Sequence, residues 1–263
     1  MTIGILYICT GKYAMFWEGF HASCEKCFLP EAEKRYFVFT DADLPPARGA
    51  TFYQEEPKGF PMDSLLRFDM FDRVKADVAG CDYVFFFNAN MRFMRTIAPD
   101  EILPRPEDGG IVAVSSPGYY NKPAMQLPFE RRKRSAAYIP YRKGDTYHYF
   151  MGGLYGGTYE AYYQMVEACR QTIGQDIKAG VLAVYHDESH LNRYLHGRPV
   201  RHLSPAYGYP EGWQLPFEPA IVILDKIKHG GKYFDKLPRK ALAKRIYLFV
   251  RRNYRAIRWR IGI

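Results

Sequence analysis

The chain has 263 residues, of which 48% are hydrophobic, so it can bury a full core as one large domain or as one domain with an appendage. No window approaches the ~20 apolar residues that a membrane span needs. The apolar stretch 3–9 is too short for a secretory signal, and the five cysteines form an odd set without a disulfide-like pattern. Together these features predict a reducing cytoplasm.

The formal net charge of +9 is concentrated in one segment. Residues 236–263 contain ten Lys or Arg and no Asp or Glu, so the rest of the chain carries 27 basic and 28 acidic residues, a net charge of −1. We therefore predict a nearly neutral body over 1–235 and a basic tail over 236–263. A nucleic-acid-binding function would rest on total charge alone, and it fails once the tail is set aside.

The tail has apolar residues at helical spacing between its basic ones. This pattern is typical of an amphipathic helix on an anionic membrane. The alternatives are a solvated or partner-bound helix and a nucleic-acid arm, although such an arm needs no regular apolar stripe. The apolar positions are Leu242, Ile246, Phe249, Val250 and Ile257, with Tyr254 and Trp259 nearby.

Strands and helices are expected to alternate along the body. Strands are predicted over 3–8, 35–40, 83–87, 111–115 and 221–224, and helices over 16–28, 64–79 and 160–173. This alternation predicts an α/β fold with a largely parallel sheet that helices cover on both faces. The region 117–140 is expected to be a basic loop.

The strand predicted over 83–87 ends in two amides, Asn88 and Asn90. Ligands of α/β sheets collect at the carboxyl ends of strands, and side chains two residues apart project from the same side. Many nucleotide-sugar transferases place Asp-x-Asp there, where two carboxylates hold a divalent cation against a diphosphate. Neutral amides are poor ligands for a hard dication, so this site is predicted to work without metal. The alternative is a turn rich in Asn.

A second segment, 185–192, reads YHDESHLN. Its histidines, His186 and His190, would share one face of a helix and could hold zinc. The glutamate lies two places after the first His, whereas HExxH places it one place after, so the metalloprotease geometry fails. The remaining alternatives are a helix N-terminus capped by Asp187 and a catalytic carboxylate presented at the start of a helix.

Six motifs occur in the order seen in the family 6 glycosyltransferases, and the chain resembles this family over about residues 1–235. The family includes the blood-group A and B transferases and α1,3-galactosyltransferase. The chain is similar to the bacterial members, which lack the membrane anchor and carry NxN where the mammalian enzymes carry DxD. The motifs are TGKY (10–13), FFFNANMRF (85–93), FERRKRSAAYIP (129–140), GGLYGG (152–157), HDESHLNRYL (186–195) and LSPAY (203–207).

The resemblance implies a retaining transferase of the GT-A fold, with a Rossmann-like nucleotide-binding sheet. Such an enzyme moves Gal or GalNAc from the UDP-sugar to the 3-hydroxyl of a β-galactoside, often one bearing an α1,2-linked fucose. No cofactor is expected beyond the donor substrate. The donor-binding residues that the resemblance implies are Ile8, Cys9, Thr10, Tyr13, Arg67, Asn88, Asn90, Met151, Gly152, Gly153, Asp187, Lys226 and Lys228.

The resemblance also implies that Glu188 is the essential carboxylate, on the β face of the donor's anomeric carbon. It would act as a covalent nucleophile or would stabilise an oxocarbenium-like state during front-face attack, and either role needs an ionised carboxylate. Asp187 would orient the donor sugar. Without metal, the charge on departing UDP needs another cation. The candidates are Lys226, Lys228 and Lys232, and the alternative for them is a solvated loop.

Donor and acceptor choice depend on a few positions. In the blood-group enzymes, the triplet matching 151–153 ends in Gly for the GalNAc enzyme and in Ala for the Gal enzyme. Gly153 leaves room for a 2-acetamido group, whereas Met151 resembles the Gal-type choice, so we predict GalNAc with Gal as the alternative. On the acceptor side, Ser116 stands where much of the family has His, and Tyr185 replaces a tryptophan. These two residues and Glu188 are the predicted acceptor-binding set.

The competing class is a glycan-binding module without catalysis, held at the membrane by its tail. The intact acidic pair argues against it, while hydrolysis of UDP-sugars alone would be a milder variant. We expect a cytoplasmic protein, peripheral at the inner face of the plasma membrane. Its expected partners are UDP-GalNAc or UDP-Gal, a β-galactoside or fucosylated acceptor and an anionic membrane surface, but no nucleic acid.

Overall fold

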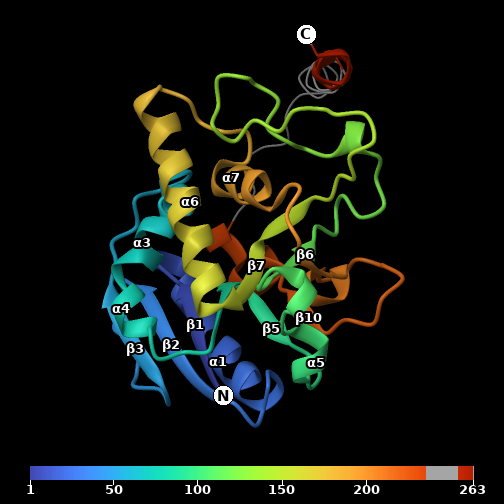
Figure 1. Cartoon of the computed structure of the whole chain (residues 1–263). Coiled ribbons are helices and arrows are strands. Elements are labelled where there is room, and N and C mark those ends of the chain that lie inside the picture. The colour runs from blue at the N-terminus through green and yellow to red at the C-terminus, as the bar shows by residue number, and fades with distance from the viewer. Residues whose placement is uncertain (235–253, 263) are drawn as a thin grey trace.

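The computed structural model describes residues 1–234 and 254–262, without the side chains of residues 232 and 233 (Figure 1). Within these residues, a seven-stranded sheet with the order β3-β2-β1-β4-β7-β6-β8 lies beside a three-stranded sheet with the order β5-β10-β9. The strands are β1 (Thr2–Ile8), β2 (Glu33–Thr40), β3 (Ala50–Gln54), β4 (Tyr83–Asn88), β5 (Met91–Phe93), β6 (Ile111–Ser115), β7 (Phe150–Thr158), β8 (Arg201–Leu203), β9 (Tyr209–Pro210) and β10 (Ile221–Ile223).

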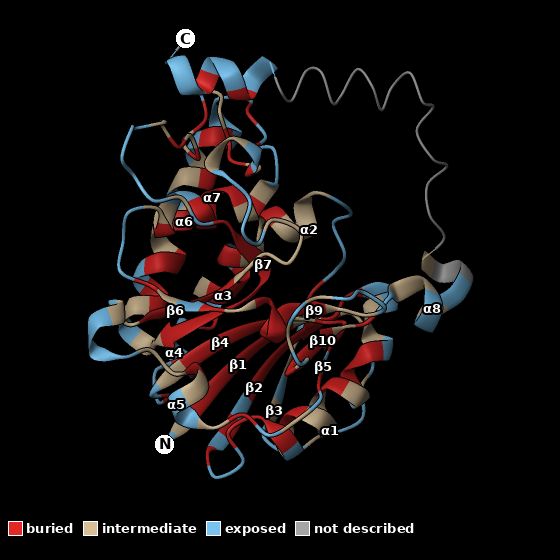
Figure 2. Ribbon diagram, turned by 90° about the vertical axis from the view of Figure 1, so that its right-hand side faces the viewer, coloured by how far each residue is buried: buried red, intermediate tan, exposed pale blue. Residues whose placement is uncertain are grey.

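Helices cover both faces of the large sheet, as the alternation of elements predicted (Figures 1 and 2). The sequence of strand β4 is apolar throughout because both of its faces are buried. Phe86 packs on the α3–α6–α7 side, and Phe85 and Phe87 pack on the α1 side. The helices are α1 (Trp17–Cys27), α2 (Met62–Leu65), α3 (Arg67–Arg73), α4 (Lys75–Val78), α5 (Pro99–Ile102), α6 (Tyr159–Lys178), α7 (His186–Leu195) and α8 (Lys226–Gly230).

Strand β7 is the main departure from the predicted parallel sheet, because it runs antiparallel to both β4 and β6. Its glycines disfavoured a strand by propensity alone. The packing explains them: a Cβ on Gly156 would lie 2.3 Å from the Phe85 ring, and one on Gly157 would lie 2.3 Å from the Gly110 carbonyl oxygen. At these two positions, the neighbouring atoms therefore leave no room for a side chain on β7.

The single helix predicted over 64–79 is instead three short helices, α2, α3 and α4. The breaks fall at Leu66 (φ −93°, ψ 10°) and Val74 (φ −102°, ψ 10°), outside the α region. The break at Leu66 places Arg67 at the start of α3, where its side chain reaches β7 and α7.

The predicted amphipathic helix over 236–263 falls largely outside the described residues, as does the proposed boundary near Asp235. Residues 254–261 are helical. Ala256 and Trp259 are each 4% exposed, so this helix packs against the body. In the ranges 1–234 and 254–262, no helix has both the length and the apolar character that crossing a bilayer requires.

Candidate active site

A cavity of about 590 Å³ opens at the carboxyl ends of β1 and β4, where Ile8 and Asn88 are partners in the sheet register. Strand β1 lies between β2 and β4, so the strand order reverses here, and ligands of open α/β sheets bind at such points. We call this space the donor cavity. The predicted donor residues that line it are Ile8, Thr10, Tyr13, Arg67, Asn88, Asn90 and Lys226.

Six predicted donor residues are not among those that line the cavity. Four of them, Met151, Gly152, Gly153 and Asp187, lie around the acidic pair described below, and the other two are Cys9 and Lys228. Cys9 is completely buried, and burial raises the pKa of its thiol to about 12, so it is a packing residue beneath the cavity. Lys228 is exposed and forms an ion pair of 2.6 Å with Glu211. The side chain of Lys232 lies outside the described part of the chain.

Lysine ammonium groups lie at the rim of the donor cavity. Lys226 donates to the Tyr13 hydroxyl at 2.8 Å and lies 4.7 Å from the centroid of the same ring. Lys12, which is not among the predicted site residues, also lines the cavity, and its ammonium lies 4.6 Å from the centroid of the Phe234 ring. The TGKY motif, which contains Lys12, was the feature of the sequence that could have indicated this position. Such cations suit an anionic ligand.

The two amides of the NxN motif lie in different surroundings. Asn90 is 3% exposed, and its amide donates to the Leu224 carbonyl at 2.7 Å. Asn88 is more accessible and lies beside Gly153. Neutral amides, one already bonded to the backbone, do not fit a hard divalent cation. Among the described residues, no group of three His, Cys, Asp or Glu side chains is placed to hold a metal.

Asp187 and Glu188 lie in the first turn of α7, where the helix dipole favours carboxylates. Glu188 accepts two short hydrogen bonds, from the Tyr149 hydroxyl at 2.5 Å and from the Gly152 N–H at 2.6 Å. Burial raises the pKa of Glu188 to about 7, although both hydrogen bonds oppose the shift. A carboxylate in this environment gains or loses its proton near neutral pH, as groups at functional sites often do.

Arg67 joins the donor cavity to this acidic pair. Its Nε lies 3.2 Å from Asp187 Oδ2, its Nη1 donates to the Gly152 carbonyl at 2.7 Å, and its guanidinium lies 4.6 Å from the centroid of the Phe86 ring. Burial raises the pKa of Asp187 to about 6, against the opposing charge of Arg67. Because Arg67 also lines the cavity, a bound donor would lie next to both carboxylates.

Two glycines of β7 allow this close approach. A Cβ on Gly152 would lie 3.1 Å from Glu188 Cβ and 3.2 Å from Glu188 Oε2. A Cβ on Gly153 would lie 2.7 Å from Met151 Cε and 2.8 Å from Asn88 Nδ2, which are the far ends of side chains. Gly152 therefore leaves room for the Glu188 carboxylate, and Gly153 leaves room beside Met151 and Asn88.

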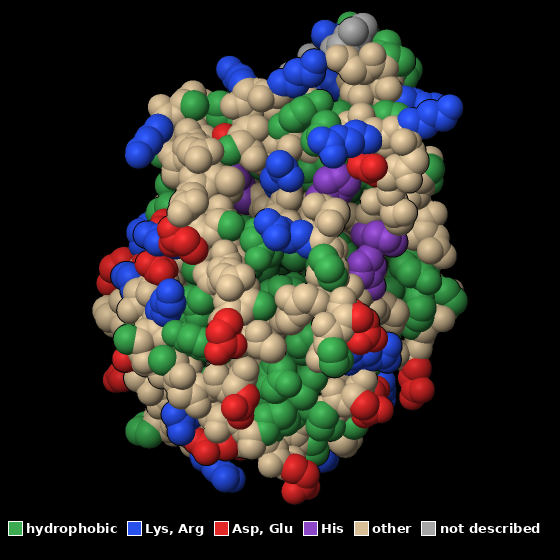
Figure 3. All heavy atoms as spheres, in the orientation of Figure 1, with side chains coloured by type: hydrophobic (Ala, Val, Ile, Leu, Met, Phe, Trp, Pro, Cys, Tyr) green, Lys and Arg blue, Asp and Glu red, His purple; other side chains and the backbone are tan. Residues whose placement is uncertain are grey.

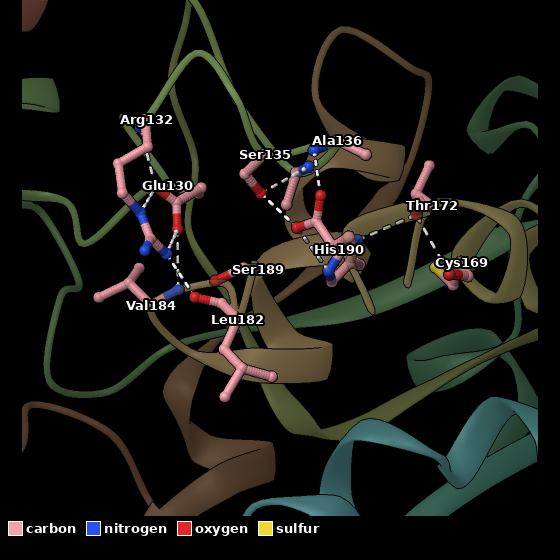
Figure 4. Close-up of polar contacts among 12 residues, drawn as sticks. Glu130, Arg132, Ser135, Ala136, Cys169, Thr172, Leu182, Val184, Ser189 and His190 are labelled. Atoms are coloured by element: carbon pink, nitrogen blue, oxygen red, sulfur yellow. Dashed lines mark hydrogen bonds and ion pairs between the residues drawn. The ribbon is translucent and has the colours of Figure 1, made fainter. Parts of the chain in front are cut away.

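Polar contacts hold α7 in position. Asn192 binds both backbone groups of Phe150, accepting from its N–H and donating to its carbonyl at 2.8 Å each, and so fixes α7 to β7. Figure 4 shows His190 turned toward α6, with Nδ1 3.0 Å from the Thr172 hydroxyl. Burial lowers the pKa of His190 to about 4, so this imidazole is neutral.

The other histidine of the motif, His186, has a left-handed backbone (φ 50°) and packs edge-on against Phe60, with 5.0 Å between ring centroids. A non-glycine residue in this conformation is often found at functional sites. His186 and His190 contact different partners, so they do not converge as the zinc alternative required.

A second cavity of about 730 Å³ shares Tyr149 with the site around Glu188, and we call it the acceptor cavity because two of the predicted acceptor residues lie at its wall. The predicted Ser116 and Tyr185 do not line it but support its wall. The Ser116 N–H donates to the Tyr149 carbonyl at 2.9 Å, and the Tyr185 and Tyr119 hydroxyls are 3.4 Å apart. The residues that line it, beyond those predicted from the sequence, include Tyr119, Tyr120, Tyr147, His148, Tyr149 and His202.

The chain is similar to known proteins of one family. The model of "Glycosyltransferase family 6" matches residues 1–229. The O-antigen biosynthesis glycosyltransferase WbnI of Escherichia coli is 33% identical over 229 residues, which cover 86% of this chain and 95% of that protein. The globoside alpha-1,3-N-acetylgalactosaminyltransferase 1 of Gallus gallus is 31% identical over 235 residues, covering 85% of this chain and 66% of that protein.

A further relative is histo-blood group ABO system transferase 2 of Rattus norvegicus, 31% identical over 231 residues, which cover 81% of this chain and 65% of that protein. This chain thus spans about two thirds of the length of these vertebrate relatives. The chain belongs to glycosyltransferase family 6, as its motifs predicted, and it is a hexosyltransferase with a GT-A-type fold.

Proposed function

We propose that this enzyme transfers GalNAc from UDP-GalNAc to the 3-hydroxyl of a β-galactoside acceptor with retention of configuration. The observation that carries the proposal is the position of Glu188. Its carboxylate is held by the Tyr149 hydroxyl and the Gly152 N–H, between the acceptor cavity and the Arg67–Asp187 pair at the donor cavity.

In this reaction, the bond between the anomeric carbon and the UDP oxygen breaks, and a bond from the acceptor oxygen forms on the same face of the sugar. The ionised Glu188 would stabilise the positive charge on the anomeric carbon or would carry the sugar as a covalent intermediate. In front-face attack, the proton of the acceptor hydroxyl would pass to the departing diphosphate. Asp187, held by Arg67, would bind the donor-sugar hydroxyls.

The preference for GalNAc rests on Gly153, where a methyl group would crowd Met151 and Asn88. The alternative donor is UDP-Gal. It is favoured by Met151, whose Cε already lies within 2.7 Å of the space that Gly153 leaves free. The side chain is flexible, so it could withdraw when an acetamido group enters.

We also propose that transfer needs no divalent metal. The ligand chemistry of Asn88 and Asn90 supports this, because neither amide supplies negative charge to a hard cation. Lys226 lines the donor cavity and would neutralise the departing diphosphate. The backbone and amide groups at the ends of β1 and β4 would position the diphosphate.

The basic tail is proposed to bind an anionic membrane surface, which would place the enzyme at the cytoplasmic face of the plasma membrane. The ten basic residues within 236–263 support this, since each Lys or Arg near an anionic surface contributes about 1 kcal/mol. A chain ending at Asp235 should therefore lose its binding to anionic vesicles.

The proposed reaction is tested by offering UDP-GalNAc and UDP-Gal with lactose and with 2′-fucosyllactose, in EDTA throughout. Transfer to either acceptor would establish the reaction and identify the donor. UDP release without a glycan product would instead point to a different acceptor. No turnover and no UDP release in any combination would contradict the proposal and favour a glycan-binding module.

A further inference from the structure

The C-terminal helix is fixed to the body by Trp259. The Trp259 Nε1–H donates to the Ile139 carbonyl at 2.6 Å. Its ring centroid lies 5.1 Å from that of Tyr141 and 6.2 Å from that of Phe129, and the Arg131 guanidinium lies 4.9 Å from the ring centroid. A buried tryptophan with its N–H satisfied fixes which side of the helix faces the body.

The opposite side of this helix is apolar and exposed. Tyr254, Ile257 and Ile261 follow one another at spacings of three and four residues and are 59%, 56% and 60% exposed. Residues at these spacings lie on one face of a helix. Arg258 and Arg260 are exposed alongside them. The helix over 254–261 thus buries one face on the body and presents a second, basic and aliphatic face to the surroundings.

One body segment contacts this helix at its end, and a second body segment contacts the first. The Lys133 ammonium donates to the Gly262 carbonyl at 2.9 Å, which places the basic run 131–134 against the end of the helix. Arg132 donates to the Leu182 carbonyl, and Figure 4 shows both beside Glu130 and Val184. Leu182 and Val184 are 48% and 47% exposed, although they are aliphatic.

The charge of this end of the molecule is mostly positive. Figure 3 shows Lys and Arg gathered over the upper part of the face around the C-terminal helix, and Asp and Glu mostly over the lower half. Among the described residues near this end, Glu130 is buried and paired with Arg132, and Asp145 lies 3.8 Å from His196. Exposed aliphatic side chains beside exposed Lys and Arg side chains suit a bilayer of anionic lipid, whereas a nucleic acid would not engage the aliphatic groups.

This end of the molecule also adjoins the acceptor cavity. Tyr147 lines that cavity, and its ring centroid lies 5.5 Å from that of Trp259. The Tyr147 ring therefore lies between the acceptor cavity and the site where Trp259 of the C-terminal helix packs on the body. A membrane bound at the helix would lie beside the cavity rather than at the far end of the sheet, where α1 lies (Figure 1).

We infer that the body and the C-terminal helix form one lipid-facing surface, made of Lys133, Arg134, Leu182, Val184, Ile257 and Ile261. It binds an anionic bilayer and holds the acceptor cavity next to it, so that the acceptor is a glycan carried on a membrane lipid. This inference rests on the proposed transferase function and adds to it the class of acceptor and the orientation of the enzyme.

The binding test uses the full chain and vesicles of phosphatidylcholine with or without phosphatidylglycerol. The variants are Lys133→Gln with Arg134→Gln, Leu182→Ser with Val184→Ser, and Ile257→Ser with Ile261→Ser. Loss of two cations near the surface should weaken partitioning onto the anionic vesicles about thirtyfold. Each aliphatic pair should weaken it about tenfold or more. The control, Lys26→Gln with Arg48→Gln, removes two exposed cations from α1 and the turn before β3 and should partition like the unmodified chain.

The activity test compares lactosylceramide in anionic vesicles with lactose in solution. The surface variants should transfer to lactose at the unmodified rate but lose about tenfold on the glycolipid. If they partition like the unmodified chain, or if anionic lipid does not raise glycolipid transfer by the unmodified chain, the inference is wrong. Failure of all transfer, with vesicle binding intact, would instead count against the proposed reaction and the acceptor class drawn from it.

Trp259→Ala tests the orientation separately. The tail keeps its charges, so vesicle binding should remain, while glycolipid transfer should fall about tenfold more than lactose transfer. Trp259→Phe, which keeps an aromatic ring at the packing site against the body, should restore most of the glycolipid rate. An equal fall with both acceptors would mean that Trp259 serves only the stability of the acceptor wall, and would overturn the orientation.

Discussion

Arg67 and Asp187 form an ion pair of 3.2 Å, and the same guanidinium donates to the Gly152 carbonyl at 2.7 Å. One side chain from α3 thereby fixes the strand and the helix that together hold Glu188. The three elements come from distant parts of the sequence, so the site exists only when the fold is complete. Arg67 also lines the donor cavity, so a ligand bound there would contact the side chain that holds Asp187.

Replacing Arg67 by Lys should lower kcat/KM for the UDP-sugar about 10- to 100-fold. A lysine is a single point of charge and cannot hold Asp187 and the Gly152 carbonyl together in the geometry of a guanidinium. Steady-state kinetics with varied donor checks this. Arg73→Lys is the matched control, because it lies on the same helix but pairs at the surface with Glu55 and should keep normal kinetics.

Replacing Glu188 by Gln should leave UDP binding unchanged and lower transfer about 10²- to 10³-fold. The amide keeps the size of the side chain but removes the negative charge that opposes the developing positive charge. Calorimetric titration with UDP and a transfer assay measure the two effects. Glu160→Gln changes an acid in the first turn of α6 and should affect neither. Near-normal transfer by Glu188→Gln would contradict the catalytic role.

Much of the fold was predictable because the signals are local. Strands β1, β2, β4 and β6 and helix α6 follow from apolar runs and periodicity. Strand β7 could not be found this way, because its glycines are required by Phe85 and by the Gly110 carbonyl, which lie on other strands. Likewise, no periodicity shows the breaks that divide 64–79 and bring Arg67 to the site.

More of the predicted donor residues than of the predicted acceptor residues line a cavity, for a related reason. Ile8 and Asn88 end strands that apolar runs predict, and the family resemblance implied Lys226, which lies at the start of α8. The acceptor cavity is instead formed by side chains such as Tyr119, Tyr149 and His202, from two loops and a strand end. Their convergence depends on long-range packing that a single sequence does not display.

The rate should depend on the ionisation of Glu188. Its pKa is raised to about 7, and the reaction needs the ionised form, so kcat/KM should rise with pH up to about 7 and level off above it. Tyr149→Phe removes a hydrogen bond that holds this pKa down, so the rising limb should move to higher pH. A pH profile measures both.

The control for this experiment is Tyr163→Phe, which removes a buried hydroxyl that donates to the Phe71 carbonyl, in the core beside α3 and α6. Its profile should match that of the unmodified enzyme. If the rising part of the kcat/KM profile stayed in place or moved to lower pH in Tyr149→Phe, this would contradict the role assigned to the Tyr149 hydroxyl.

Gly153→Ala should lower the ratio of GalNAc to Gal transfer about 10- to 100-fold. The new methyl would press against Met151 and Asn88, both flexible, so the fold should persist while space for the acetamido group is lost. Gly152→Ala, by contrast, should impair both donors equally, because its methyl would meet Glu188 itself. If the ratio of GalNAc to Gal transfer were unchanged in Gly153→Ala, a residue other than Gly153 would determine the selectivity for the acetamido group.

Chelation of divalent metals should leave the transfer rate unchanged, because amides stand where the metal-dependent pattern has carboxylates. The measurement is initial rate in EDTA against added Mn²⁺, with Lys226→Gln assayed in parallel. If Lys226 neutralises the leaving diphosphate, its loss should lower kcat about 10²-fold, and Mn²⁺ should not restore it. The paired Lys228→Gln should be milder, since that ammonium is bound to Glu211 rather than facing the cavity. Strict dependence of the unmodified enzyme on Mn²⁺ would contradict the metal-free mechanism.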